Sequence, residues 1–240
     1  MQKPDLDPAH LYEFDGLGTH WWCESLDGQF TPDITTAIDE TVRQFVGRYS
    51  RFDEHSLLSQ LNRDGHLHSP PHEMIRMLHF ARDMFQTSGG VFNISVGGAL
   101  NRLGYGNVAR GAAVSSTFWD ETVLEATRIS IPAGISLDFG GFGKGWLVDA
   151  LSDLLASRGI HQSIVNGGGD MMISSATPVE LALEHPLDSA RQIGTNREST
   201  AHWRQALLSN GRGLAAVMHS IISLTRCGRV PHSLILSPRS

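Results

Sequence analysis

Ile135-Ser-Leu-Asp-Phe-Gly-Gly-Phe-Gly-Lys-Gly-Trp-Leu-Val-Asp149 is the stretch from which the rest of the sequence is best interpreted. Its first five residues alternate apolar side chains with smaller or polar ones, which predicts a short strand. Four glycines follow, and from Trp146 apolar residues recur three or four positions apart, which predicts an amphipathic helix. A glycine-rich turn between a strand and a helix N-terminus lets backbone N–H groups approach an anion.

Two charged side chains flank this glycine-rich turn. Asp138 ends the predicted strand and Lys144 begins the helix, a combination that suits a phosphorylated, hydroxyl-bearing ligand such as a nucleotide. Two structural interpretations stay open: the glycines serve only tight packing, or Asp138 pairs with Lys144. The common phosphate-binding fingerprints do not apply, because Gly145 stands where a Walker A loop has Ser or Thr and the spacing does not fit G-x-G-x-x-G.

Length and composition narrow the class of protein. A chain of 240 residues can bury a sizeable core, as one large domain or two small ones. The net charge of −6, without any Lys/Arg run, argues against nucleic acid as the main partner. No stretch approaches the roughly 18 apolar residues that a membrane span requires, and the first residues lack an apolar signal core. The sequence therefore predicts a cytoplasmic protein without a membrane span.

Three further segments have structure that can be predicted. Residues 11–26 are expected to form one opening strand, and residues 91–96 an extended segment that turns at Gly97-Gly98. Residues 162–165 predict a strand that runs into the turn Asn166-Gly-Gly-Gly-Asp170. This second turn is either another place where backbone meets a ligand or a plain glycine hairpin.

Three histidines, His66, His68 and His72, crowd a proline-containing segment. A zinc site is one interpretation, because imidazole is a common zinc ligand. However, no Cys or carboxylate completes the ligand set, and Pro70-Pro71 separates the third histidine from the others. A solvated loop is the better interpretation.

Five segments, taken in chain order, resemble one known family. They are residues 12–19, residues 52–62, residues 90–97 with Tyr105-Gly106 after them, residues 137–149 and residues 165–170. In this order they resemble the FAD:protein FMN transferases, the flavin transferases of the ApbE family. The resemblance runs from residue 12 to about residue 194.

The resemblance implies both a fold and an activity. The implied fold is α+β, a two-lobed ApbE/T-fold-like architecture with mixed or antiparallel sheets and packed helices. The implied enzyme is a Mg²⁺-dependent transferase that takes FMN from FAD and joins it through a phosphoester bond to a Thr or Ser of an acceptor flavoprotein. In phosphoryl transfer, catalysis consists mainly of positioning and charge neutralisation.

Matching positions also imply roles for individual residues. Asp138 would accept hydrogen bonds from flavin or ribose hydroxyls, Lys144 would counter phosphate charge, and the carbonyl of Gly141 would be a Mg²⁺ ligand, an oxygen of the kind this ion prefers. Asn93 stands where the family usually has Asp, so it keeps hydrogen bonding and loses charge. The residues implied to line the flavin are Leu17, Phe52, Val91, Phe92 and Asn93.

The likeness stops at about Thr195. We therefore expect a flavin-transferase-like region over residues 1–194 and a divergent tail over residues 195–240, without the family's last metal-binding segment. A shifted reading frame is one hypothesis, because back-translation of residues 202–206 permits the family's Leu-Ala-Thr-Ser. Two rival functions stay open: an FAD-binding protein that transfers nothing, which the missing metal-binding segment favours, and a Mg²⁺-dependent FAD pyrophosphatase in which water replaces the acceptor hydroxyl.

Overall fold

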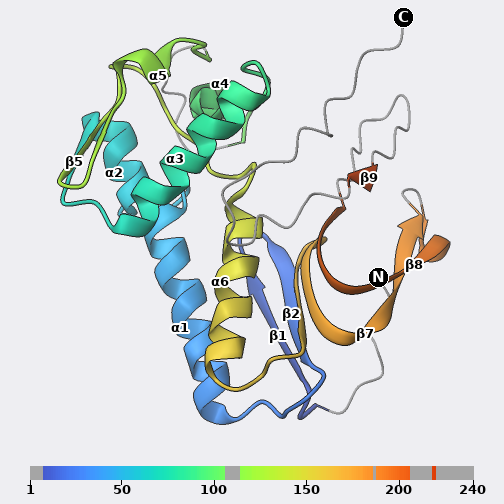
Figure 1. Cartoon of the computed structure of the whole chain (residues 1–240). Coiled ribbons are helices and arrows are strands. Elements are labelled where there is room, and N and C mark those ends of the chain that lie inside the picture. Colours follow the sequence, from blue (N-terminus) through green and yellow to red (C-terminus); the bar gives the residue numbers. More distant parts are fainter. Residues whose placement is uncertain (1–7, 106–113, 186–187, 206–217, 220–240) are drawn as a thin grey trace, which may run out of the picture.

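The fold combines two antiparallel sheets with packed helices, as the computed structural model of the chain describes it for residues 8–105, 114–185, 188–205 and 218–219. One sheet has six strands in the order β1-β2-β6-β7-β8-β9, and the other has three strands in the order β3-β5-β4. In Figure 1, α1 and α6 lie against the larger sheet, and α2 to α5 gather with the smaller sheet in a second lobe. The predicted α+β class with two lobes is confirmed.

The larger sheet and its two helices form the first lobe. Its strands are β1 Leu11–Gly16, β2 Thr19–Ser25, β6 Ser163–Gly167, β7 Asp170–His185, β8 Asp188–Gln205 and β9 Met218–His219. Its helices are α1 Pro32–Tyr49 and α6 Gly143–Ser157. Each of these two long helices buries an apolar stripe, because its apolar residues recur three or four positions apart. The buried side chains are Ile34, Ile38, Val42, Phe45 and Tyr49 in α1, and Leu147, Val148, Leu151 and Leu155 in α6.

The second lobe is built from the elements that lie between α1 and α6 in the chain. In chain order they are α2 Leu57–Asp64, β3 His66–His68, α3 His72–Thr87, the 3₁₀ helix η1 Ile94–Val96, α4 Gly97–Arg102, α5 Phe118–Glu121, β4 Val123–Glu125 and β5 Arg128–Ser130. One continuous hydrophobic core runs through both lobes, from Trp21 in β2 to Ile129 in β5. The two lobes therefore share their packing.

Residues 11–26 form two strands, so the prediction of one strand is wrong. β1 and β2 are joined by Leu17-Gly18, whose φ angles are 49° and 74°. Two consecutive left-handed residues give a turn that matches the twist of a two-residue hairpin. The hairpin places Leu17 at its tip, 36% exposed.

The prediction of an extended segment over residues 91–96 with a turn at Gly97-Gly98 is also wrong. Asn93 begins the 3₁₀ helix η1, because its side-chain oxygen accepts a hydrogen bond from the Ser95 backbone N–H at 2.8 Å. Gly97 continues directly into α4, and its N–H donates to the Ser136 carbonyl at 2.9 Å. This bond ties α4 to the segment that precedes the glycine-rich turn.

The second glycine turn is a hairpin between β6 and β7, and the predicted strand before it is confirmed. β6 also pairs with β2, with Trp21 opposite Gly167, so the β6–β7 turn lies beside the Leu17 turn. The strand β8 pairs with β7 from Asp188 to Arg204 and continues across residue 195. The division of the chain near residue 195 stays a prediction of the sequence. In the part of the chain that the structure describes, no helix has the length and hydrophobicity to cross a bilayer.

Cys23 in β2 is fully buried, and burial raises the pKa of its thiol to about 12. Because the thiolate is the reactive form, we expect Cys23 to resist a thiol reagent at neutral pH. A Cys227→Ser variant isolates this thiol, and its labelling rate in the folded and the urea-unfolded chain measures the effect. Labelling at the unfolded rate in native conditions would contradict the burial.

The raised pKa of Cys23 also affects the stability of the folded chain at high pH. A pKa that is raised on folding favours the folded chain at pH values below the unfolded pKa, and this contribution is lost as the pH rises through the folded value. The folded chain should therefore lose stability between about pH 9, the ordinary thiol value, and about pH 12. Unfolding midpoints across this range should fall less steeply in a Cys23→Ala variant. Equal slopes in both chains would count against the assignment.

Candidate functional site

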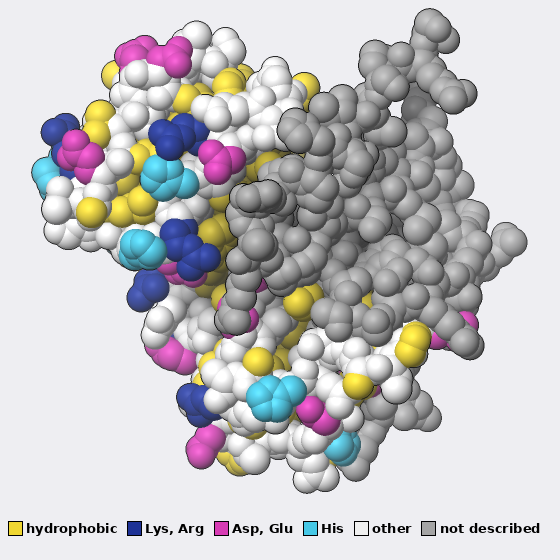
Figure 2. All heavy atoms as spheres, viewed as in Figure 1, with side chains coloured by type: hydrophobic (Ala, Val, Ile, Leu, Met, Phe, Trp, Pro, Cys, Tyr) yellow, Lys and Arg dark blue, Asp and Glu magenta, His cyan; other side chains and the backbone are white. Residues whose placement is uncertain are grey.

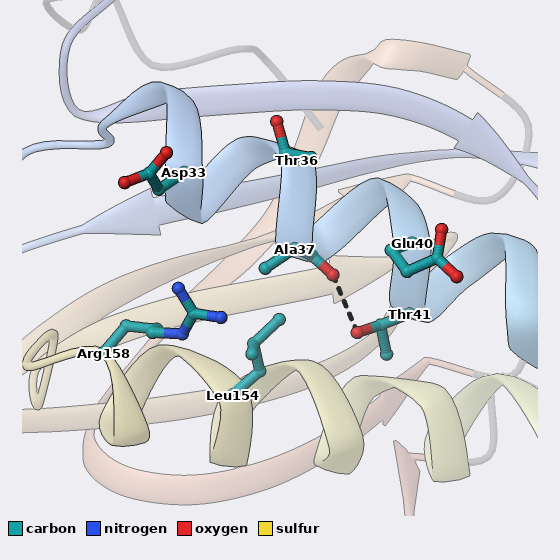
Figure 3. Close-up of a pocket in the computed structure, with 7 residues that line it drawn as sticks. All are labelled: Asp33, Thr36, Ala37, Glu40, Thr41, Leu154 and Arg158. Carbon is teal, nitrogen blue, oxygen red and sulfur yellow. Dashed lines mark hydrogen bonds between the residues drawn. The ribbon is translucent and has the colours of Figure 1, made fainter.

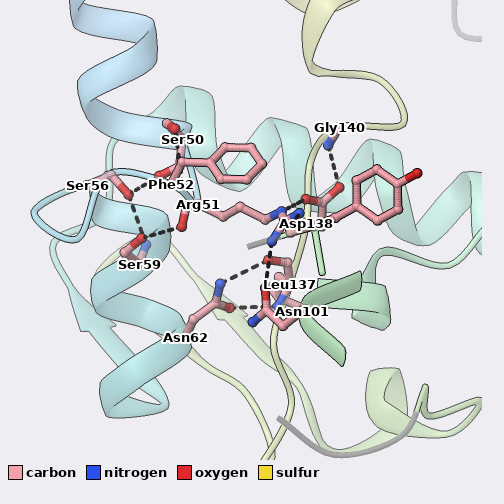
Figure 4. A network of polar contacts seen from close by, with 11 residues as sticks. Ser50, Arg51, Phe52, Ser56, Ser59, Asn62, Asn101, Leu137, Asp138 and Gly140 are labelled. Carbon is pink, nitrogen blue, oxygen red and sulfur yellow. Dashed lines mark hydrogen bonds and ion pairs between the residues drawn. The ribbon is translucent and has the colours of Figure 1, made fainter. Parts of the chain in front are cut away.

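An ion pair between Arg51 and Asp138 is the centre of the candidate site. Nε of Arg51 contacts Oδ2 of Asp138, and the two side chains are only 9% and 12% exposed (Figure 4). Asp138 Oδ1 accepts a hydrogen bond from the Gly140 N–H at 2.8 Å. The interpretation in which Asp138 pairs with Lys144 is thereby replaced, since the observed partner of the carboxylate is Arg51.

Arg51 connects three segments that are distant in sequence. Its Nη1 donates to the Asn101 side-chain oxygen at 2.8 Å, and its Nη2 donates to the Tyr105 carbonyl. Its guanidinium carbon lies 4.3 Å from the centre of the Phe52 ring, a cation–π contact. Arg51 was not among the residues predicted from the sequence. The available signal was a basic side chain directly before Phe52, at the border of the segment 52–62 that resembles the family.

The loop that carries Arg51 is held between the end of α1 and the start of α2. Ser56 caps α2, because its hydroxyl oxygen accepts from the Ser59 N–H at 3.0 Å. The same hydroxyl donates to the Ser50 carbonyl at 2.6 Å. One buried serine therefore sets where α2 begins and how the loop returns toward Asp138.

The segment before the glycine-rich turn does not belong to either sheet, contrary to the predicted strand. The Asn62 side chain takes the place of a neighbouring strand: its amide donates to the Leu137 carbonyl at 2.9 Å and accepts from the Leu137 N–H at 2.7 Å (Figure 4). The Asp138 N–H donates to the Ile94 carbonyl at 2.8 Å. The helix α6 then begins at Gly143, one residue before Lys144, which was predicted to begin it.

An Asn62→Ala substitution should therefore loosen the segment that carries Asp138. It leaves the N–H and the carbonyl of the buried Leu137 without partners, a loss of about 1–3 kcal/mol for each unsatisfied group. Urea unfolding measures this loss. Asn62→Asp is a companion variant, since it keeps an acceptor for the Leu137 N–H and replaces the donor with a negatively charged oxygen. Unchanged stability in Asn62→Ala would show that water replaces the amide.

The glycine-rich turn brings a second aromatic residue to the site. The Phe92 ring lies 3.3 Å from the position that a Cβ at residue 141 would occupy, so a side chain at Gly141 would crowd this ring. Phe92 also lies against Phe142, with ring centres 6.2 Å apart. Phe52, Asp138, Gly141 and Phe92 are thus connected through Arg51 and the turn. That they form one ligand site stays a prediction.

The residues implied to line the flavin differ in their exposure and in their contacts. Val91 is 88% exposed and Phe52 is 61% exposed, so both present apolar surface to solvent. Asn93 uses its side chain locally, because its amide nitrogen donates to the Ser115 carbonyl at 2.9 Å and its oxygen accepts from Ser95. This pairing gives Asn93 a role in holding the loop before η1.

Lys144 lies at the N-terminal end of α6, and the chain's connectivity places it near the hairpin turns. A short connection leads from the end of α6 at Ser157 to the start of β6 at Ser163, so the first turn of α6 lies toward the other end of β6 (Figure 1). That end carries the Leu17 turn and the β6–β7 turn. Among the described residues, Lys144 has no hydrogen-bonding or ion-pair partner. Its charge is available to a ligand.

The described residues do not provide a complete magnesium site. No group of three or more His, Cys, Asp or Glu side chains that could hold a metal ion occurs in the described ranges. The Gly141 carbonyl offers a single oxygen, whereas Mg²⁺ takes an octahedral set and usually completes it with water and substrate phosphates.

A depression of about 520 Å³ lies elsewhere, between α1 and α6 (Figure 3). It is open and carries charges of both signs, and one of its hydroxyls, that of Thr41, already donates to the Ala37 carbonyl at 2.8 Å. Its α6 residues come from the end of the helix opposite Lys144, which separates it from the candidate site. The lining residues are Asp33, Thr36, Ala37, Glu40, Thr41, Leu154 and Arg158.

Comparison with known proteins gives a consistent result. The ApbE family profile matches residues 17–213. The chain belongs to the ApbE family. Over 180 residues it is 26% identical to the FAD:protein FMN transferase of Vibrio cholerae, an alignment that covers 67% of this chain and 53% of that protein. Over 130 residues it is 25% identical to the protein of the same name from Rhodobacter capsulatus, covering 48% of this chain and 25% of that protein. The chain thus spans about half the length of the first ApbE relative.

Solved ApbE structures have the same fold. The flavin transferase ApbE from Vibrio cholerae superposes with a TM-score of 0.69 at 21% identity, covering 88% of this chain and 75% of that one. The ApbE protein from Thermotoga maritima gives a TM-score of 0.69 at 20% identity, covering 82% of this chain and 70% of that one. The architecture predicted from the sequence motifs is therefore the ApbE architecture.

Proposed function

We propose that this chain binds FAD and transfers its FMN moiety, in a Mg²⁺-dependent reaction, to a Thr or Ser hydroxyl of an acceptor flavoprotein. The observation that carries the proposal is the Arg51–Asp138 pair at the glycine-rich turn, bordered by Phe52 and Phe92. Two relatives, each named FAD:protein FMN transferase, point to the same chemistry.

Asp138 is the proposed acceptor for flavin or ribose hydroxyls. Arg51 holds one of its oxygens and the Gly140 N–H holds the other, so the carboxylate has a set orientation. Each carboxylate oxygen keeps a further lone pair with which it can accept a hydrogen bond from a ligand hydroxyl. The exposed apolar surfaces of Phe52 and Val91, with Phe92 and Leu17, would contact the flavin ring system.

Lys144 is the proposed counter-charge for the pyrophosphate. It lies in the first turn of α6, where the helix dipole also favours an anion. When bound, Mg²⁺ would neutralise phosphate charge, and the Gly141 carbonyl is its proposed ligand in this chain. The cytoplasmic location of the protein stays a prediction.

One experiment tests transfer against the two rival functions. The full chain is incubated with FAD, Mg²⁺ and an acceptor domain that carries a target Thr, and the acceptor is weighed by mass spectrometry. Transfer predicts a covalent flavin on the acceptor, absent with EDTA and absent from an acceptor with Thr→Val. Release of FMN and AMP without acceptor labelling would indicate a pyrophosphatase, and bound FAD without either product would indicate a binding protein.

A Lys144→Gln substitution should weaken FAD binding about tenfold, equivalent to about 1.4 kcal/mol of lost phosphate attraction. Fluorescence titration of FAD measures this affinity. Arg158→Gln is a matched control, because it also removes one positive charge but does so at the C-terminal end of α6, far from Lys144 in the first turn. Equal losses in both variants would indicate a general charge effect and no local contact.

A further inference from the structure

The segment that the sequence predicted to be a solvated loop is the strand β3, and it presents two histidines on one face. β3 pairs with β5, and its central residue Leu67 is 4% exposed and lies opposite Ile129, which is 0% exposed. Side chains alternate between the faces of a strand, so His66 and His68 both point away from this core. Both side chains are exposed.

The two imidazoles are close enough to bind one ion together. Their ring centres are 5.4 Å apart and the ring planes are inclined by 72°. Metal–nitrogen bonds of ~2.0–2.1 Å place each ring centre roughly 3 Å from the ion, so rings up to about 6 Å apart can share it. The observed separation lies inside this limit and suits a bent arrangement of the two nitrogens around the ion.

A backbone contact selects the form of His66 that can bind a metal. Its Nδ1 lies 2.9 Å from the Asp64 carbonyl oxygen. A carbonyl can only accept a hydrogen bond, so Nδ1 carries the proton and the Nε2 lone pair is left for an ion. Ring nitrogens of metal-binding histidines typically have such a backbone or carboxylate partner, which orients the ring.

We propose that His66 and His68 form a surface site for one imidazole-preferring divalent ion of the Zn²⁺ class, with water in the other positions. The site uses nitrogen ligands, so it should not select Mg²⁺, which prefers oxygen. Among the described residues no carboxylate or thiol joins the pair to make a three-ligand group. This proposal does not depend on flavin transfer.

The neighbouring strands set the electrostatics of the site. On the same face, Arg128 in β5 lies opposite His68, and Glu125 in β4 lies opposite Arg128. Ser130 and Val123 lie in the row opposite His66 and carry no charge. On the face in Figure 2, basic, acidic and histidine side chains are interspersed over the described surface of this lobe. Arg128 should repel a divalent ion, and Arg128→Gln should therefore tighten binding.

Calorimetric titration of the untagged full chain with Zn²⁺ tests the proposal. His66→Gln and His68→Gln should each weaken binding at least about tenfold, and the double variant should remove this binding event. His55→Gln, at an exposed loop position, is the matched control and should bind as the parent chain does. Mg²⁺ should neither bind at the site nor compete with Zn²⁺.

Thermal unfolding provides a second measurement. An ion that binds the folded state raises the melting temperature, so Zn²⁺ should raise it in the parent chain and in His55→Gln but not in the double variant. Circular dichroism establishes that each variant is folded. Unchanged Zn²⁺ affinity in the double variant, or an equal loss in His55→Gln, would overturn the proposal and assign the ion to other histidines.

Discussion

Replacing Arg51 with methionine is expected to destabilise the folded chain by about 3–5 kcal/mol, because it leaves the carboxylate of Asp138 buried without its partner. Both side chains are nearly inaccessible, so solvent screens the pair little. The substitution also removes the contacts to Asn101 and Tyr105 that join α4 to the loop. Urea unfolding measures the stability, and FAD titration should show that binding is lost with it.

Three further variants separate charge from geometry. Arg51→Lys keeps the positive charge but cannot make the forked contacts, so it should retain part of the stability and less of the FAD affinity. Asp138→Asn removes the negative charge, and combination with Arg51→Met completes a double-mutant cycle. The double variant should be more stable than the two single losses added together. Additive losses, or a loss below about 1 kcal/mol in Arg51→Met, would contradict a strong ion pair.

Trp21→Ala is expected to destabilise the chain by about 3–5 kcal/mol, because it empties a large volume at the centre of the core. Trp21 is 0% exposed, it stacks on Phe14 with ring centres 5.8 Å apart, and its Nε1–H donates to the Gly16 carbonyl at 2.7 Å. The hairpin that carries Leu17 depends on these contacts. Urea unfolding followed by circular dichroism measures the loss without relying on tryptophan fluorescence.

Two companion variants define the cause. Trp22→Ala lies on the opposite face of the same strand, where the side chain is only partly buried, and should cost less. Gly167→Ala would place a Cβ 2.4 Å from the Trp21 ring, and such overpacking typically costs about 1–3 kcal/mol. In a Trp21→Ala background this second cost should disappear. Equal losses for Trp21→Ala and Trp22→Ala would show that position in the core is not what matters.

Local patterns in the sequence were enough to predict several parts of this structure. The apolar period of residues 147–155 predicted α6, because a helix buries one stripe whatever its partner is. The glycines of residues 166–170 predicted the β6–β7 turn, because few other residues adopt its backbone angles. The order of five short motifs indicated the ApbE family, which the family comparison confirms. The helix and the turn depend on neighbouring residues only, and each of the five motifs is itself a short local pattern.

Tertiary contacts decided what local patterns could not. Residues 135–139 have the alternating pattern of a strand, but no strand pairs with them. The backbone of Leu137 instead bonds to the side chain of Asn62, 75 positions away. Residues 94–102 become helical where Asn93 and Gly97 find partners in Ser95 and Ser136. The partner of Asp138 is Arg51 and not its neighbour in sequence, Lys144. A carboxylate pairs with whichever cation the fold brings to it, and that choice depends on the packing of the whole chain.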